Sequence, residues 1–526
     1  MNALPVPEMA IGRTQMRVQE VMYGHRFVND QEPYMIVLEA LAVMADKPLG
    51  TVRPSEMEHE AFQYRIPHRR KLRFLLFQDR NLEKVWMDSE IRDVDKWRIW
   101  KERVNIQWED SVNMQPPPNG GIVDHFRYLN QPFENSLRQL RQYVRTLQAV
   151  ELDALNKRRW TSRFLAVTGP DMICADVRAQ GGNWSMDRRF FGRGGELVYL
   201  MLNRSPLADE LRELVHGCFL NRDDPLNRMA KALSDPFEDS DSKTQMGYLP
   251  YIRHRTYEQL AQDWRAILRL ERLPKSHKFE PLVRITALNL TVFLAQLTQD
   301  HIKGNNIGES HGMPLVMDFA NGSDMLVRNC SKAIFNRQRK KAQIAVRKFV
   351  KRRANDSAEW KTAVELGHPK SANLALERLF AFKNEDSLRS PESQLETLIK
   401  IATERKRNNM SNFLLPLTRN AGLVLAKPGI GTWLAMSDKG IIALVMTVGV
   451  HPMELRDFVA RLYKRYGIVA GPAEARKAFD QLPINIKRFE TNLAALEERM
   501  SRLSLTRRLS DDCAFISNPY TSAQHE

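Results

Sequence analysis

The sequence predicts a mainly α-helical, multi-domain protein with minor β-structure and a winged-helix module at its C-terminal end. In most of the long apolar segments, hydrophobic residues recur at spacings of three and four, which is the period of a helix face. Candidates for β-strands are few and short. The chain has 526 residues, of which 43% are hydrophobic, so it can form about three separate domains.

The first predicted domain spans residues 1–160 and is helical. Residues 34–44 place apolar side chains three positions apart, which indicates one helix face. Residues 68–86 mix basic and apolar side chains and are expected to form a short buried helix with a basic flank. Residues 114–121 contain three prolines and two glycines, so we expect a loop there. Helical spacing resumes over residues 133–155.

The second predicted domain spans residues 161–385 and is also mainly helical. Residues 163–176 indicate a strand or a short apolar element, and residues 282–299 a strongly apolar core helix. Residues 313–320 are the best strand candidate, because apolar residues lead into a turn of polar ones. Residues 331–353 are predicted to form a basic helix.

The third predicted domain spans residues 396–520 and follows a polar boundary segment, residues 382–396. Its last stretch, residues 505–519, can form a β-hairpin that turns at residues 510–512. Helices followed by a small hairpin indicate a winged-helix module. The expected helices are residues 393–406, 439–448, 452–466 with Gly467 as a C-terminal stop, 472–479 and 485–503.

The charge balance points to a polyanionic partner. Lys and Arg number 79 against 63 Asp and Glu, which gives a net charge of +16. Nucleic acid is the usual partner of such a protein, and an anionic membrane surface or an acidic protein is the alternative. A solvated basic surface without a partner is the simplest reading.

The strongest local signal is the predicted helix over residues 331–353, which holds ten basic residues and no acidic one. Apolar residues at helical spacing let one face pack inward, so the rest becomes a cationic surface roughly 35 Å long. Phosphates can offset the repulsion along it. A solvated helix face, or pairing with an acidic domain, would explain the same pattern. The predicted nucleic-acid-binding residues here are Arg337, Arg339, Lys340, Lys341, Arg347, Lys348, Lys351, Arg352 and Arg353.

The C-terminal module supplies a second set of basic residues. A winged helix can place one helix in the major groove and its hairpin on the backbone, although many such modules contact only proteins. We expect Arg461, Lys464 and Arg465 to contact nucleic acid. Further basic residues of this module are Arg456, Arg476, Lys477, Arg507 and Arg508.

A glycine-rich segment, residues 181–196, precedes a predicted helix and could cradle phosphate with Arg188, Arg189 and Arg193. It does not match the phosphate-binding loop of nucleotide hydrolases or the dinucleotide-binding fingerprint. An ordinary turn is the competing interpretation.

Support for hydrolytic chemistry is limited to Asp318, which ends the strand candidate, with Glu309 and His311 nearby in sequence. A metal-dependent nuclease needs several carboxylates around its metal. An aspartate in this position commonly caps the following turn. Glu359 and Lys361 have the spacing of a nuclease motif, but their segment is predicted to be helical.

The sequence contains no pattern that indicates a metal site, a disulfide framework or a membrane segment. The four cysteines, Cys174, Cys218, Cys330 and Cys513, are scattered and form no metal-binding or disulfide pattern. No signal peptide or membrane span is recognisable. We therefore expect no cofactor, no membrane contact and a cytoplasmic protein.

Four segments resemble poorly characterised subunits of bacterial anti-phage defence systems: residues 34–44, 68–78, 188–202 and 508–519. The resemblance implies a subunit that acts with an ATPase or nuclease on foreign DNA, and it carries no catalytic residue onto this chain. The sequence thus predicts a non-catalytic, DNA-binding subunit of a defence or DNA-processing complex. A nuclease using Asp318, or a scaffold that binds an acidic protein, are the alternatives.

Overall fold

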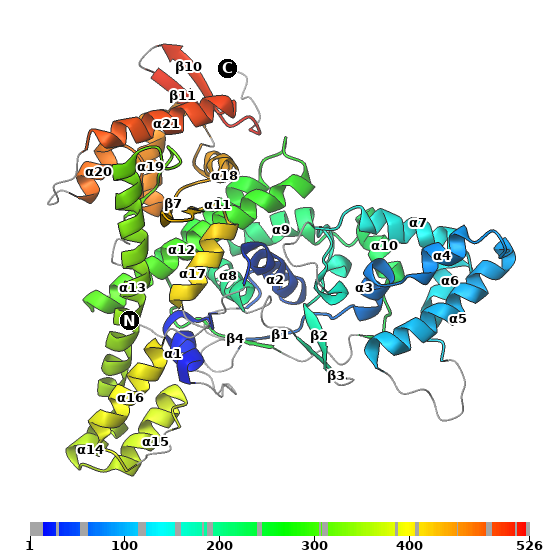
Figure 1. The fold of residues 1–526 in the computed structure, drawn as a ribbon, viewed down its shortest axis with the longest axis horizontal. Helices are drawn as coiled ribbons and strands as arrows, with labels where there is room; N and C mark the ends of the chain where they lie inside the picture. Colours follow the sequence, from blue (N-terminus) through cyan, green and yellow to red (C-terminus); the bar gives the residue numbers. More distant parts are fainter. Residues whose placement is uncertain are drawn as a thin grey trace.

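The structure is a computed structural model of the chain, and helices dominate it (Figure 1). Among the described residues there are 21 α-helices, with 65% helix and 7% strand, so the mainly α prediction is confirmed. The described residues are 14–27, 31–52, 62–113, 123–152, 159–180, 183–186, 193–238, 245–304, 307, 314–383, 388–404, 410–449, 451–479, 486–510 and 513–521.

A lobe of short helices encloses the smaller of two hydrophobic cores, at the right of Figure 1. Its centre is aromatic: Phe74, Trp108 and Phe126 lie within ring-contact distance of one another. The lobe consists of α3 (Arg70–Phe77), α4 (Asn81–Met87), α5 (Asp93–Val112), α6 (Asn130–Phe133), α7 (Leu137–Gln148) and α10 (Pro225–Leu233).

The single helix predicted over residues 68–86 is wrong, because the chain breaks between α3 and α4. The Asp79 carboxylate accepts hydrogen bonds from the backbone nitrogens of Asn81 at 2.8 Å and Leu82 at 3.2 Å, so it starts a new helix. The other carboxylate oxygen accepts from the Trp100 indole at 2.9 Å. The predicted loop at residues 114–121 lies outside the described residues.

The larger core surrounds α12 (Phe279–Lys303), whose residues are buried on nearly every side. A helix that is apolar all round belongs inside a protein, which confirms the core helix predicted over residues 282–299. Two of the earlier helices pack directly against it, α2 (Pro33–Asp46) and α11 (Arg255–Leu268). In a next layer, α8 (Gly194–Asn203) packs on both α2 and α11, and α9 (Ala208–Phe219) packs on α11. Buried residues of α1 (Thr14–Tyr23) belong to the same core.

By length and composition alone, one helix among the described residues could cross a membrane. It is residues 275–303, which include α12, and 94% of its most apolar window is buried inside the protein.

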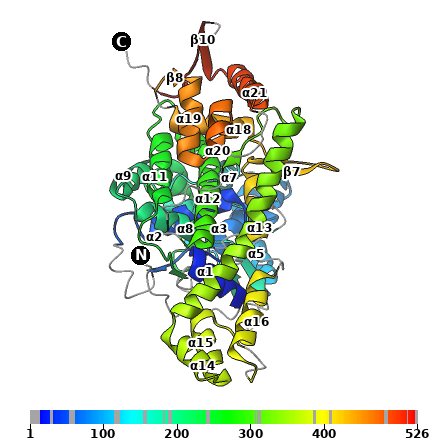
Figure 2. The same cartoon turned by 90° about the vertical axis from the view of Figure 1, so that its left-hand side faces the viewer.

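Along one side of the larger core runs α13 (Met325–Asp356), the longest described helix (Figures 1 and 2). It packs against α12 and is followed by four shorter helices, of which the first, third and fourth contact it directly. These are α14 (Ala358–Glu365), α15 (Pro369–Phe380), α16 (Pro391–Thr403) and α17 (Met410–Asn420).

The C-terminal elements lie at one end of α13. The expected helices and hairpin are present, and Gly467 ends α19 with φ 74°, a backbone conformation that favours glycine. The helices are α18 (Asp438–Val448), α19 (Leu455–Tyr466), α20 (Pro472–Ala478) and α21 (Arg488–Arg502).

The strands of the described residues form five small sheets. The strand predicted at residues 313–320 is confirmed as the two-residue β5, which pairs in parallel with β9. The hairpin β6–β7 was not predicted, and it packs on α13. Residues 163–176 contain a 3₁₀ turn and no named strand. The pairs are β1 (Phe62–Tyr64) with β4 (Gln245–Gly247), β2 (Val177–Gln180) with β3 (Asn183–Met186), β5 (Leu315–Val316) with β9 (Ile468–Val469), and β6 (Val424–Lys427) with β7 (Gly431–Leu434). The fifth sheet has the order β10 (Thr506–Ser510), β11 (Cys513–Ile516), β8 (Met453–Glu454).

The two hydrophobic cores divide the chain differently from the three predicted domains. Buried residues between 18 and 66 belong to the larger core, and those between 72 and 147 to the smaller one. The described α-helices after α11 all contribute buried residues to the larger core. The three-domain division stays a prediction.

Candidate nucleic-acid interface

The predicted basic helix is α13, which is longer than expected at both ends. Its first turn is capped by the Asp324 carboxylate, which accepts hydrogen bonds from the backbone nitrogens of Leu326 at 2.9 Å and Val327 at 3.1 Å. Its 32 residues extend over about 48 Å. An apolar stripe anchors it to the core: Val327, Ile334, Phe335, Ala342, Ala345, Val346, Phe349, Val350 and Ala354.

Three cations of α13 serve the neighbouring helix α12. Lys348 Nζ donates to the Ile302 carbonyl at 2.7 Å, and Arg352 Nη2 donates to the His301 carbonyl at 3.3 Å. One turn earlier, Lys341 Nζ donates to the Gln299 amide oxygen at 3.0 Å. The last carbonyls of a helix lack partners within it and carry a partial negative charge, so these cations stabilise the end of α12.

Two further cations share one carboxylate. Glu396, on α16, accepts from Arg347 at 2.7 Å and from Lys351 at 2.8 Å. All three side chains are about half exposed, so the pairing is weak. The two hydrogen bonds and charges together hold the pKa of Glu396 below its usual range.

Arg337 and Lys340 are exposed and have no hydrogen bond or ion pair within the part of the chain that the structure describes. With Ile344, Arg347 and Lys351 they follow a spacing of three and four along one exposed side of α13. We call these five residues the solvent stripe. Ile344, 49% exposed, puts an apolar side chain in its middle.

The remaining cations of the predicted helix lie closer to the protein. Lys332 donates to the carbonyl of Ile430 in the β6–β7 hairpin. Arg339 and Arg353 are half-buried, and Arg339 has an interaction of its own. Arg353 lies beside Arg17, whose pKa is lowered by burial and further by this neighbour, despite Glu20.

Most of the hydrogen bonds that these cations donate go to uncharged carbonyl or amide oxygens, so the positive charge of α13 is not neutralised. Burial lowers the pKa of Lys341, and the positive charges of the nearby Arg337 and Lys303 lower it further, because like charges disfavour the protonated amine. The only carboxylate that pairs with the solvent stripe in the described residues is Glu396.

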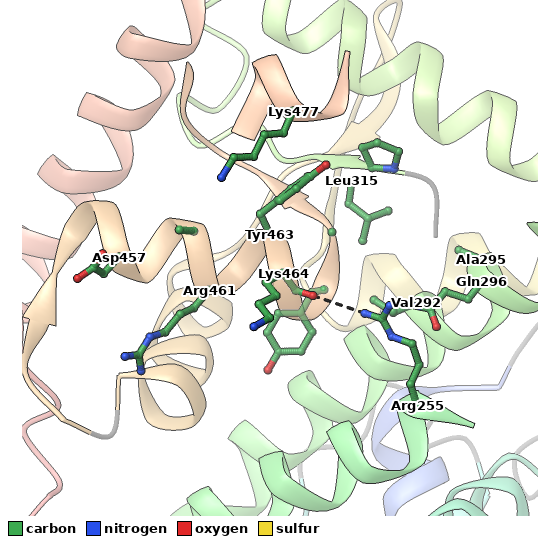
Figure 3. A pocket seen from close by; sticks show the side chains of 14 residues that line it. Arg255, Val292, Ala295, Gln296, Leu315, Asp457, Arg461, Tyr463, Lys464 and Lys477 are labelled. Carbon is green, nitrogen blue, oxygen red and sulfur yellow. Dashed lines mark hydrogen bonds between the residues drawn. The ribbon is translucent and has the colours of Figure 1, made fainter. Parts of the chain in front are cut away.

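The predicted contacts on α19 border a cavity of about 790 Å³ (Figure 3). Arg461 and Lys464 are exposed at its rim, together with Lys477 of α20 and Arg255 at the start of α11. Arg255 Nη2 donates to the Lys464 carbonyl at 3.4 Å, which joins α11 to α19. Among the described residues, the lining contains one carboxylate, Asp457, against four cations.

Arg465, the third predicted contact on α19, points inward instead. Its guanidinium forms an ion pair with the buried carboxylate of Asp263 at 2.5 Å and donates to the Gln259 carbonyl at 3.2 Å. Burial raises the pKa of Asp263 to about 6, although Arg465, Asn289 and Tyr466 favour its charged form. Arg465 therefore joins α19 to α11, and little of it faces solvent.

The cavity and the middle of α13 meet on α12. Gln296 lines the cavity, and Gln299, the acceptor of Lys341, is its neighbour three residues along the same helix. In Figure 2, α12 lies between α13 and α11. Arg255 and Gln296 could not be found from the sequence, because α11 and α12 are distant from α19 along the chain. Gln296 is one of three amides in the apolar α12, with Asn289 and Gln299, so no local signal singled it out.

Asp318 is fully buried and used by the fold. One carboxylate oxygen accepts from the Trp433 indole at 2.8 Å and the other from the Ala320 backbone nitrogen at 3.0 Å. Burial raises its pKa. No group of three or more potential metal ligands occurs within the described ranges, and Glu309 and His311 lie outside them. The turn-capping interpretation of Asp318 fits these contacts.

In the glycine-rich segment, Arg193 is buried in a cluster of charges. It pairs with Glu196 at 2.6 Å and with Glu20 of α1. Glu39 of α2 accepts from the backbone nitrogens of Arg193 at 3.0 Å and Gly195 at 2.7 Å, and so caps α8. The start of α8 is thus closed by the protein's own carboxylates. Arg188 and Arg189 lie outside the described residues.

No protein-family model matches this chain, and no curated protein matches it.

Proposed function

We propose that this protein binds nucleic acid, with DNA as the expected form, through the solvent stripe of α13. The observation that carries the proposal is the exposed pair Arg337 and Lys340, whose cations meet no carboxylate in the described residues. Next to them, Arg347 and Lys351 share a single exposed carboxylate. Backbone phosphates supply the missing negative charge and release counterions on binding.

Contacts of this kind grip phosphates without reading bases. We therefore expect weak sequence specificity. Arg461 and Lys464 add exposed positive charge beside the cavity at α19, whereas Lys341, Lys348 and Arg352 contribute charge while holding α12 in place.

We also propose that residues 438–516 form a winged helix. The supporting observation is the element order α18, β8, α19, β9, α20, α21, β10, β11, in which three of the strands form a sheet in the order β10, β11, β8. In such a module α21 would take the place of the groove-reading helix. Its exposed side carries Glu490 and Glu498 beside Arg488 and Arg502, so it has no positive excess. Phosphate binding is therefore assigned to α13.

The cellular setting is a proposal that rests on the sequence resemblance alone. We propose a cytoplasmic subunit of a bacterial defence or DNA-processing complex, with an ATPase or nuclease as partner. The basic surface is compatible with an acidic protein partner as well, and the experiment below separates the two.

Charge reversal tests the proposal. Arg337→Glu with Lys340→Glu should weaken binding of a labelled DNA duplex by at least roughly tenfold, because two phosphate contacts are replaced by repulsion. The measurement is a gel-shift titration at low salt, with single-stranded DNA and RNA of the same sequence run in parallel.

The matched control is Arg103→Glu with Arg138→Glu, two exposed residues of the smaller lobe that give the same change in net charge. If both double variants weaken DNA binding equally, net charge alone explains the effect, and the solvent stripe is rejected as the binding surface. Absence of any binding by the wild type would reject nucleic acid altogether. Mg²⁺-dependent cleavage lost in Asp318→Ala would favour the nuclease.

A further inference from the structure

The cavity beside α19 differs from the solvent stripe in shape and in chemistry. It is a hollow of about 790 Å³, which is within the range of small-molecule sites, and far more than one phosphate needs. Figure 3 shows side chains from four separate helices, α11, α12, α19 and α20, around one space. A site assembled from so many elements is shaped by the tertiary fold.

The floor of the cavity is apolar, with one unsatisfied amide. Val292 and Ala295 of α12 line it together with Leu315 of β5. Gln296 is 2% exposed, and its side-chain oxygen has no hydrogen-bond partner within the described part of the protein. A buried polar atom without a partner costs free energy, so a ligand that hydrogen-bonds this amide would gain affinity.

The wall and rim add an aromatic ring and positive charge. Tyr463 is half-buried and stands between Lys477 and Leu315 in Figure 3. The cations Arg461, Lys464 and Lys477 are exposed at the mouth. The cavity therefore changes from apolar with an amide at its floor to cationic at its mouth.

We propose that this cavity binds a nucleoside phosphate, with the base at the floor and the phosphate at the mouth. A base offers a flat apolar face for Tyr463 and polar edges for the Gln296 amide, which pairs well with the edge of adenine. The phosphate meets Arg461, Lys464 and Lys477, for which charge-assisted hydrogen bonds are strong. A bare anion would leave the floor and the amide unused.

The nucleoside phosphate can come from two sources. If the ligand is a free mononucleotide, the inference does not depend on the proposed function. If it is an unpaired nucleotide of a bound strand, the inference rests on the proposed nucleic-acid binding. Isothermal titration of the full chain with adenosine 5′-monophosphate, adenosine and orthophosphate tests the first source. Anisotropy with a labelled single-stranded oligo-dA tests the second.

We expect Arg461→Glu with Lys464→Glu to weaken nucleotide binding by roughly tenfold or more, because charge-assisted contacts are lost. Gln296→Leu should weaken the nucleotide and leave orthophosphate unchanged. Lys477→Glu, at the exposed rim, provides a second test if either of these fails to fold. Arg337→Glu with Lys340→Glu should weaken duplex DNA and leave the mononucleotide unaffected, so failure of the stripe and failure of the cavity are distinguishable.

Each possible outcome either supports the nucleoside phosphate site or overturns it. Mononucleotide binding that depends on Gln296 and Lys464 supports the free source. Oligonucleotide binding with the same dependence, and no mononucleotide binding, supports the strand source. Orthophosphate binding as tight as the mononucleotide overturns the assignment of the base. Binding of both probes that none of the cavity variants changes, or no binding of either, overturns the proposal.

Discussion

Three buried histidines make the stability of the folded protein sensitive to acid. Burial lowers the pKa of His25, His254 and His301 to about 3 in each case. The unfolded chain binds these protons near pH 6.5, so it gains protons that the folded protein excludes. Their contribution to stability is complete above pH 6.5 and is lost as the pH falls from there towards 3.

His254 offers a test of this. Its ring accepts a hydrogen bond from the Thr256 backbone nitrogen at 3.3 Å at the start of α11. Asparagine is a favoured residue at this capping position and does not titrate. We predict that His254→Asn loses less stability between pH 6.5 and 4.5 than the wild type, by up to about 1 kcal/mol per pH unit. Chemical denaturation across pH measures it, and parallel curves for the two proteins would contradict it.

Cations that look alike in the sequence have different tasks within α13. Lys348 and Arg352 stabilise the C-terminal end of α12 by donating hydrogen bonds to its last carbonyls. Arg337 and Lys340, by contrast, contact no described residue by hydrogen bond or ion pair. The pattern of a basic helix cannot separate these tasks, because the partners lie on another helix. This distinction belongs to the element, since it depends on which side of α13 faces α12.

Neutral substitutions separate the two tasks. Lys348→Met and Arg352→Met should each lower the free energy of unfolding by about 0.5–1 kcal/mol, because the end of α12 loses a cation and a hydrogen bond. Arg337→Met and Lys340→Met should leave it nearly unchanged. Urea denaturation of the four variants provides the comparison. Equal destabilisation by all four would show that the exposed pair also has a structural role.

At the scale of the whole molecule, the sequence predicted most of what local pattern determines. The helix faces, the apolar α12, the basic α13 and the C-terminal hairpin all follow from periodicity within one segment. The break at Asp79 was missed because one carboxylate there both starts α4 and binds Trp100 of another helix.

The basic residues of the candidate site could be predicted from the sequence, but the tertiary contacts that bring them together could not. Arg461 and Lys464 follow from the local excess of cations, but Gln296 gains meaning only where α12 meets α19. Arg465 and Arg193 resemble surface cations in sequence, and both are paired with carboxylates from distant helices. Tertiary partners, which periodicity does not encode, decide which charges remain available.

The most direct test of the account is the salt dependence of DNA affinity, measured by fluorescence anisotropy. For the wild type, the logarithm of the association constant should fall linearly with the logarithm of salt concentration, by about 0.9 per phosphate contacted. Glu396→Gln releases Arg347 and Lys351, so it should tighten binding and steepen this line by up to about 2, while Arg337→Glu with Lys340→Glu should make it shallower. A line without slope, or one that neither change alters, would contradict the claim that α13 faces a polyphosphate.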